Sequence, residues 1–351
     1  MKIKFSFILM VCLLLTACNN VVFQINIVPP EITPTLQVTG SMTFDTPQAT
    51  PTLQVETPAI SPTPLIFPSP TSSHATLGGA SALLFSSNRG GDYLDLYLQA
   101  FGSNVLTRLT QGESNTFAGP FSPDGKKIVF TGFGLTESYV GVMNADGSDP
   151  VDLTALPDVS DGFPTWSPDG SQIAFTSRRD GNNEIYLMDA YGHALKRLTF
   201  TPGDDFAPSW SPDGKQIAFL SDRDGQTGVY SIYIMNAAAS WVKRLTDDGG
   251  NDYTPAWSPN GATIVFRSDH EGQSDIFSIS VDGSNLTNLT NTPKSNEWSP
   301  AWSPDGTLIA FQTDRDGNWE IYTMQANGAD PVNFTNNPAD DEMPFWKKAD
   351  E

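Results

Sequence analysis

The chain has 351 residues, of which 40 are acidic and 19 basic, and its net charge is −21. A negative field of this size repels polyanions, so we expect no nucleic-acid partner. The sequence contains three histidines and no Gly-x-Ser-x-Gly pentapeptide, which argues against a histidine-held metal and against a serine-hydrolase triad. We therefore predict no catalytic residue, no metal and no cofactor.

The N-terminus has the pattern of a secretory signal. Two lysines precede an apolar run from Phe5 to Leu15, and the sequence Leu-Thr-Ala-Cys follows, ending at Cys18. The apolar run is too short to span a bilayer. Small residues before a cysteine resemble the lipobox of bacterial lipoproteins, which predicts a signal peptide over residues 1–17 and lipid attachment at Cys18. The alternative is an ordinary signal peptide with a chance cysteine. Since Cys12 would leave with the leader, no disulfide is expected in the mature chain.

Residues 18–78 differ in composition from the rest of the chain. Ten prolines lie there among threonine, serine and valine, with almost no charge. Proline fixes φ and lacks an N–H donor, so this stretch cannot form a helix or a central strand. We predict a disordered, extended tether over residues 18–78 and a single folded domain over residues 79–347.

The folded region is built from a repeated phrase, "WSPDGxxIAF". Its aromatic residues recur every 44 to 47 residues, at Phe121, Trp166, Trp210, Trp257, Trp302 and Trp346. A period of forty to fifty residues is typical of a propeller or a solenoid. Each unit contains four short β-like runs separated by turn residues, such as "APSW", "KQIAFLS", "SIYIMNA" and "VKRLT". Four strands per repeat predict a propeller blade, and we expect the tryptophans to lie between neighbouring blades.

Counting the strands predicts how the ring closes. Second strands are expected at six places, residues 82–87, 127–132, 172–177, 216–221, 263–268 and 308–313. The first has no inner strand before it, whereas an unassigned run, "MPFW", follows the last blade at residues 343–346. If this run completes blade one, no sheet edge is left open between the termini. We therefore predict an all-β fold, a six-bladed β-propeller of four-stranded antiparallel blades closed by a blade shared between the N- and C-terminal ends.

The repeat from Trp166 to Thr199, "WSPDGSQIAFTSRRDGNNEIYLMDAYGHALKRLT", resembles the WD40-like repeats of the TolB type. The resemblance implies a β-propeller and often a location in the cell envelope. TolB-type proteins carry an α/β domain ahead of the propeller, where this chain has the Pro/Thr-rich tether. A shared fold does not fix the function.

An acidic residue recurs five positions before the inner-strand aromatic. It is present at Asp161, Asp205, Asp252, Glu297 and Asp341, while blade two has Thr116. In five blades the loop after the second strand carries a basic residue, at Arg89, Arg179, Arg223, His270 and Arg315. The strand order places both sets on one face, around the mouth of the central channel, where they form a candidate binding rim. The alternative is a structural role, in which the carboxylates cap loops or pair with the arginines between blades.

Loop variation on the same face indicates recognition. Blade four has a longer loop from Asp222 to Ser231, and blade two replaces the common motif with "FGLTESY". We expect a monomeric, non-catalytic binding module for an envelope protein or a polar or cationic ligand. It would touch the membrane only through its N-terminal lipid, on the outer side of the cytoplasmic membrane or, in a host with an outer membrane, in the periplasm or outer membrane. The competing prediction is an envelope carbohydrate-active or other hydrolytic enzyme that uses an acidic channel site.

Replacing the lipid-attachment residue tests the anchor. Cys18→Ser should release the protein from the membrane fraction or block its processing, because no thiol remains to carry the lipid. Cell fractionation and immunoblotting measure this, and Cys12→Ser is the matched control because that cysteine is removed with the leader. A Cys18→Ser protein that fractionates with the membrane as the wild type does would refute the lipobox interpretation.

Overall fold

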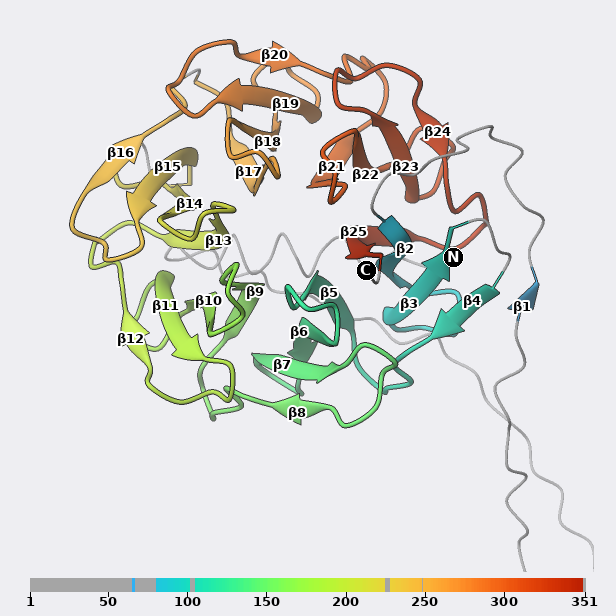
Figure 1. Ribbon diagram of the computed structural model, residues 1–351, viewed down its shortest axis with the longest axis horizontal. Helices are drawn as coiled ribbons and strands as arrows, with labels where there is room; N and C mark the ends of the chain where they lie inside the picture. Colours follow the sequence, from blue (N-terminus) through green and yellow to red (C-terminus); the bar gives the residue numbers. More distant parts are fainter. Residues whose placement is uncertain (1–64, 67–79, 102–104, 225–227, 248, 350–351) are drawn as a thin grey trace, which may run out of the picture. The chain divides into compact units, whose positions relative to one another are not determined.

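The computed structural model describes residues 65–66, 80–101, 105–224, 228–247 and 249–349. All regular structure among them is β, arranged as six sheets around a central axis (Figure 1). The predicted all-β, six-bladed propeller is therefore confirmed. It lies within a compact unit that runs from Pro64 to Glu351. The predicted signal peptide, Cys18 and nearly all of the predicted tether lie outside the described residues. No segment of the described residues forms a helix with the length and apolarity needed to cross a bilayer.

Blades two to six follow the chain from the innermost to the outermost strand. Blade two contains β5 (Thr116–Phe121), β6 (Lys127–Phe133), β7 (Ser138–Asn144) and β8 (Val151–Asp152). Blade three contains β9 (Asp161–Trp166), β10 (Gln172–Ser177), β11 (Glu184–Asp189) and β12 (Lys196–Arg197). Blade four contains β13 (Asp205–Trp210), β14 (Gln216–Ser221), β15 (Ser231–Asn236) and β16 (Val242–Arg244). Blade five contains β17 (Asp252–Trp257), β18 (Thr263–Ser268), β19 (Asp275–Ser280) and β20 (Thr287–Asn288). Blade six contains β21 (Glu297–Trp302), β22 (Leu308–Thr313), β23 (Glu320–Gln325) and β24 (Val332–Asn333).

Blade one joins the two ends of the propeller. Its strands, from the axis outward, are β25 (Asp341–Lys348), β2 (Ala80–Ser87), β3 (Asp95–Ala100), β4 (Val105–Arg108) and β1 (Leu65–Ile66). β25 pairs antiparallel with β2, with Trp346 opposite Leu83 and Asp341 opposite Ser87. The predicted closure is thus confirmed, although the inner strand is longer than the "MPFW" run because it pairs along most of the eight-residue β2.

Strand β1 was not predicted, since its residues fall within the proposed tether. It pairs with β4 at the outer edge of blade one, Leu65 opposite Leu106 and Ile66 opposite Val105. Nearby prolines exclude a central strand but are tolerated at an edge, where one side of the strand needs no partner. The tether prediction is therefore corrected at these two residues.

The alternating strand directions give every blade two distinct ends. The end with the Ser-Pro-Asp-Gly turns between first and second strands is called the turn face. The opposite end, with the connections between blades and between second and third strands, is called the loop face. Each inner strand carries a proline, which is tolerated because that strand has a sheet partner on one side only.

Side-chain hydrogen bonds explain the repeated turn sequence. The Ser211 hydroxyl donates to Asp213 Oδ1 at 2.7 Å and accepts the N–H of Gln216 at 2.9 Å. Gly214 has φ +69°, a conformation that side chains rarely adopt, and its N–H donates to the Ser211 carbonyl. The same bonds recur in the turns beginning at Ser122, Ser167, Ser258 and Ser303. The phrase that defines the repeat is therefore architectural.

The tryptophans of the phrase lie at the junctions between blades, as predicted. Trp166 packs with Val129 and Val140 of blade two, and Trp210 packs with Ala174 and Ile185 of blade three.

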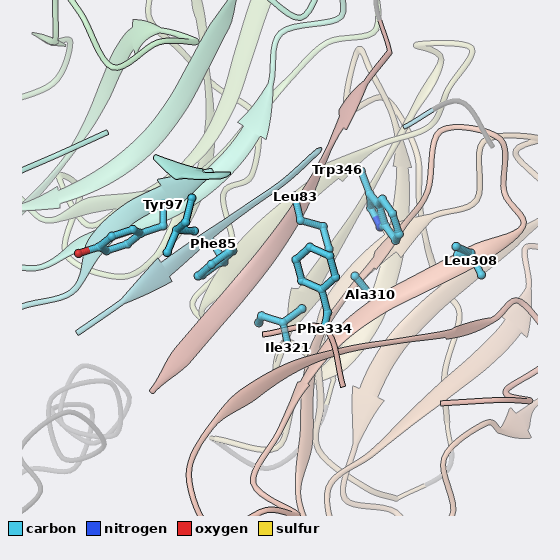
Figure 2. Packing of buried hydrophobic residues seen from close by; sticks show 9 residues of the cluster. Leu83, Phe85, Tyr97, Leu308, Ala310, Ile321, Phe334 and Trp346 are labelled. Carbon is cyan, nitrogen blue, oxygen red and sulfur yellow. The ribbon is translucent and has the colours of Figure 1, made fainter. Parts of the chain in front are cut away.

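The closing junction is built in the same way, and Figure 2 shows its cluster. Trp346 shares it with Leu83 and Phe85 of blade one and with Leu308 and Phe334 of blade six. The indole N–H of Trp346 also donates to the Ala301 carbonyl at 2.9 Å. Closure thus depends on burial of a large aromatic side chain as well as on strand pairing.

Removing the closing indole tests this dependence. Trp346→Ala should cost about 3–5 kcal/mol, the usual range for deleting a large buried ring, out of a total stability of roughly 5–15 kcal/mol. Thermal and denaturant unfolding measure it. Trp346→Phe, which keeps a ring but loses the N–H donor, should lose less. Truncation after Ala339 removes all of β25 and should give an insoluble or severely destabilised chain. An unchanged melting temperature in Trp346→Ala would contradict closure through this residue.

Candidate functional site

The five acidic positions of the predicted rim are buried. Each is the first residue of an innermost strand, and each is at most 1% exposed; they are Asp161, Asp205, Asp252, Glu297 and Asp341. A carboxylate at that depth requires a partner, because burying an unpaired charge is costly.

Arginines supply the partner in four blades. The ion pairs are Asp161 with Arg179 at 3.0 Å, Asp205 with Arg223 at 2.8 Å, Glu297 with Arg315 at 3.2 Å, and Asp341 with Arg89 at 2.5 Å. Each arginine also donates through Nε to the hydroxyl that ends the second strand, at Ser177, Ser221, Thr313 and Ser87. Both partners of every pair belong to the same blade.

The carboxylates of the predicted rim are therefore buried at all five positions and paired with an arginine at four of them. The alternative, pairing with the arginines, matches the structure, but the pairs form within blades and not between them. Burial raises the pKa of Asp341, and the Arg89 guanidinium offsets part of that effect. Burial likewise raises the pKa of Asp205 and Glu297. These residues belong to the scaffold that fixes the loop-face ends of the blades.

Blades two and five depart from this pattern. His270, which takes the arginine position in blade five, is exposed, and its ring lies edge-on to Phe277 at 6.4 Å. Asp252 accepts a hydrogen bond from the Thr246 hydroxyl. Among the described residues no ion pair joins Asp252 to His270. Thr116 of blade two, which has no carboxylate, is half-buried and pairs with Gly132.

The next residue along each inner strand varies among the blades. In order from blade two to blade one these residues are Phe117, Gly162, Phe206, Tyr253, Trp298 and Glu342. They follow the acidic position, so they lie near the loop-face end of the strands that surround the axis (Figure 1). Because no single residue type is kept at this position, the repeat pattern does not reveal it. Their signal in the sequence is variation at a fixed place on a uniform scaffold.

Aromatic side chains near the loop-face ends of the strands form a series across blades three to six, which we call the aromatic arc. Its members are Phe163, Phe206, Tyr230, Tyr253, Trp298 and Trp319. Successive ring centroids lie 4.8–6.1 Å apart, except between Tyr253 and Trp298, where a guanidinium is inserted. Phe206 and Tyr230 are buried, whereas Tyr253, Trp298 and Trp319 are half-buried.

The inserted group is Arg267, on the second strand of blade five. Its Cζ lies 4.4 Å from the Tyr253 centroid and 4.2 Å from the Trp298 centroid, and its Nε donates to the Ser274 hydroxyl at 3.0 Å. No carboxylate of the described residues lies within ion-pair distance of it. Burial lowers the pKa of Arg267, and nearby Asp269 offsets part of that effect.

In four other blades the residue equivalent to Arg267 has a structural role. Ser86, Thr131, Thr176 and Gln312 each accept a backbone N–H from the inner strand of the next blade, at 2.8–3.2 Å. A guanidinium has no acceptor, so Arg267 cannot make this bond. Blade four has Leu220 there, which cannot make it either.

Glu342 stands at the end of this series of variable positions. It is half-buried, and no ion pair or side-chain hydrogen bond to it is found among the described residues. Burial raises the pKa of Glu342 to about 8, with further contributions from Asp340 and Asp341. Its carboxyl is therefore mostly protonated at neutral pH and can donate a hydrogen bond.

Two hollows lie beside blades two and three. One of about 220 Å³ is lined by Leu153, Leu156, Arg179, Met188 and Leu195 among others. A neighbouring one of about 250 Å³ is lined by Gly134, Glu137, Tyr139, Leu156 and Pro157 among others. The second includes the "FGLTESY" loop, whose Leu135 is fully exposed. Within the described part of the chain no group of three or more histidine, cysteine, aspartate or glutamate side chains could hold a metal.

Comparison with known proteins supports the resemblance noted in the repeats. Residues 153–232 and 226–299 match the family model of the TolB beta propeller domain. A TolB homologue of Chlorobium luteolum is 33% identical over 128 residues, which cover 36% of this chain and 28% of that protein. An uncharacterized protein of Agrobacterium fabrum is 32% identical over 112 residues, 30% of this chain and 38% of that protein. The chain thus matches less than two fifths of the length of either relative.

The fold is also similar to a solved structure. The crystal structure of TolB from Acinetobacter baumannii superposes with a TM-score of 0.67 at 23% identity, over 77% of this chain and 67% of that chain. At this identity the similarity concerns the fold alone.

The raised pKa of Glu342 predicts a pH-dependent stability. A carboxyl whose pKa is about 8 when folded and 4.5 in its ordinary state stabilises the fold below pH 4.5, and that contribution is lost as pH rises through 8. Glu342→Gln should therefore melt close to the wild type near pH 4.5 and several degrees above it at pH 9, since each kcal/mol corresponds to roughly 2–4 °C.

Melting curves of both proteins between pH 4.5 and 9 measure this difference. Glu113→Gln, which neutralises an exposed carboxylate between β4 and β5, is the control and should show no such trend. A difference between Glu342→Gln and wild type that does not change with pH would contradict the assignment.

Proposed function

We propose that this chain, which contains a TolB-type β-propeller, is a lipid-anchored extracytoplasmic binding module that recognises an envelope protein or a polar ligand without chemically changing it. The proposal rests on the positions at which the blades depart from their common repeat. The turns and junctions recur in nearly every blade, whereas the aromatic arc, Arg267 and Glu342 do not. These non-repeating residues lie near the loop-face ends of the strands.

Two irregular loops lie at the loop face. The "FGLTESY" loop of blade two and the loop after β14 in blade four both connect second to third strands, so they belong to that face. The turn face carries five similar Ser-Pro-Asp/Asn-Gly turns. Recognition is generally placed on variable loops held by a rigid scaffold. A partner is therefore expected on the loop face.

The state of the acidic residues favours binding over hydrolysis. An acidic catalytic site needs carboxylates that reach substrate. Of the five positions predicted for such a site, all are buried and four are held by arginines. This arrangement supports a scaffold role and therefore the binding module.

The proposed location rests on the sequence. The leader and Cys18 predict export and a lipid anchor on the outer side of the cytoplasmic membrane, or in the periplasm or outer membrane where the host has one. A monomeric propeller on a long tether would then have its loop face available to an envelope protein.

Site-specific crosslinking in intact cells tests the proposed face. Benzoylphenylalanine placed at Leu135 should crosslink to a discrete envelope component several-fold more than at Lys215, because Leu135 is on the loop face and Lys215 on the turn face. Both side chains are well exposed, at 106% for the residue and 80% for the side chain, so the comparison reports the face. Equal crosslinking from the two positions, or none from Leu135, would count against the proposal.

A further inference from the structure

We propose that Arg267, held between Tyr253 and Trp298, binds the carboxylate of a ligand on the loop face, such as the C-terminal carboxylate of a partner polypeptide with an apolar last residue. This inference rests on the proposed function and specifies the chemistry by which that face recognises its partner.

The guanidinium is held in place from three sides. The rings of Tyr253 and Trp298, from blades five and six, lie 4.4 and 4.2 Å from its Cζ, and the Ser274 hydroxyl accepts its Nε–H. An arginine has five N–H donors, and four remain on the terminal nitrogens after this bond. The described residues provide no acceptor for those four. A planar cation held by two rings loses little further freedom on binding, which favours affinity.

Most of the other arginines are engaged differently. Seven lie within ion-pair distance of an acidic side chain, namely Arg89, Arg108, Arg179, Arg197, Arg223, Arg244 and Arg315. Arg267 is as enclosed as several of these but has aromatic rings where they have a carboxylate. A partly buried cation without an anion is disfavoured, which agrees with the lowered pKa of Arg267. A ligand anion would relieve this cost.

The charge of the protein selects the kind of anion. A net charge of −21 repels a phosphate dianion more strongly than a monoanion. A carboxylate carries a single charge, and its two oxygens match the parallel N–H groups of a guanidinium. A carboxylate is therefore preferred over a phosphate.

The rings beside Arg267 indicate what the carboxylate is attached to. Tyr253 and Trp298 are half-buried, and Trp319 lies 5.0 Å from Trp298 and is also partly exposed. Aromatic side chains next to a bound carboxylate offer contact to an apolar or aromatic group attached close to it. The C-terminal residue of a polypeptide, with an apolar side chain beside its carboxylate, has this arrangement.

Binding of a minimal ligand tests the inference on the full chain. The probes are N-acetyl-phenylalanine, its amide, and inorganic phosphate, each titrated by calorimetry with tryptophan fluorescence as a second readout. The acid should bind saturably, and the amide and phosphate should each bind at least tenfold more weakly. Equal affinity for acid and amide, tighter binding of phosphate, or no saturable binding of the acid at millimolar concentration would each overturn the proposal.

Three variants locate the site. Arg267→Leu introduces the residue that blade four has at this position, so it should fold, and it should weaken binding of the acid at least tenfold. Arg267→Lys keeps the charge but loses the planar fork and should also weaken it several-fold. Lys215→Gln removes an exposed cation from the turn face and should bind as the wild type does. Unchanged binding in Arg267→Leu, with a melting temperature like that of the wild type, would exclude Arg267 as the receptor.

The crosslinking from Leu135 separates the two proposals. If it persists while the acid does not bind, the loop face remains the partner-binding face and only the carboxylate assignment fails. If it is absent while the acid binds through Arg267, the site stands and the proposed protein partner fails.

Discussion

The antiparallel pairing of β25 with β2 joins the two ends of the propeller, and the burial of every blade depends on it. A single four-stranded blade has two apolar faces, and each is covered only by a neighbour, as the clusters around Trp166, Trp210 and Trp346 show. An open array would leave one face of the first blade and one of the last in water. Closure therefore contributes a whole junction of buried apolar surface, and the tryptophan of the repeat fills it.

Ring closure also explains why the ion pairs are buried. The innermost strands crowd around the axis, and the first residue of each lies beneath the loop that follows the second strand. An acid there, bonded to the arginine of that loop, ties the two segments together, as Asp341 and Arg89 do across the join between the chain ends. Blade five lacks this pair, since His270 replaces the arginine and the Thr246 hydroxyl contacts Asp252. In the same blade Arg267 is the second-to-last residue of the second strand, β18. The pattern of buried ion pairs is therefore interrupted in the blade that holds the candidate ligand site.

The sequence predicted the features that repeat. The second strands expected at residues 172–177, 216–221, 263–268 and 308–313 have those bounds in the structure, and the shared blade follows from the unpaired "MPFW" run. Spacing also placed Asp161 and Arg179 at the same end of a blade. The spacing could not show that these two side chains contact each other, because their contact and burial depend on how closely the inner strands approach one another around the axis. The aromatic arc was missed because its members come from different strand positions, Phe163 and Tyr230 among them, and become neighbours only when the ring forms.

Departures from the repeat carry a structural cost, and their positions support a role in recognition. In four blades a side chain on the second strand accepts an N–H from the next inner strand. Leu220 and Arg267 cannot, so the junctions from blade four to five and from five to six lack that bond. The rings of Tyr230, Tyr253 and Trp298 cross these two junctions. A scaffold under selection for stability alone would keep the bond that its other junctions make. Substitution of both positions beside an arc of aromatic side chains is consistent with a surface shaped by a ligand.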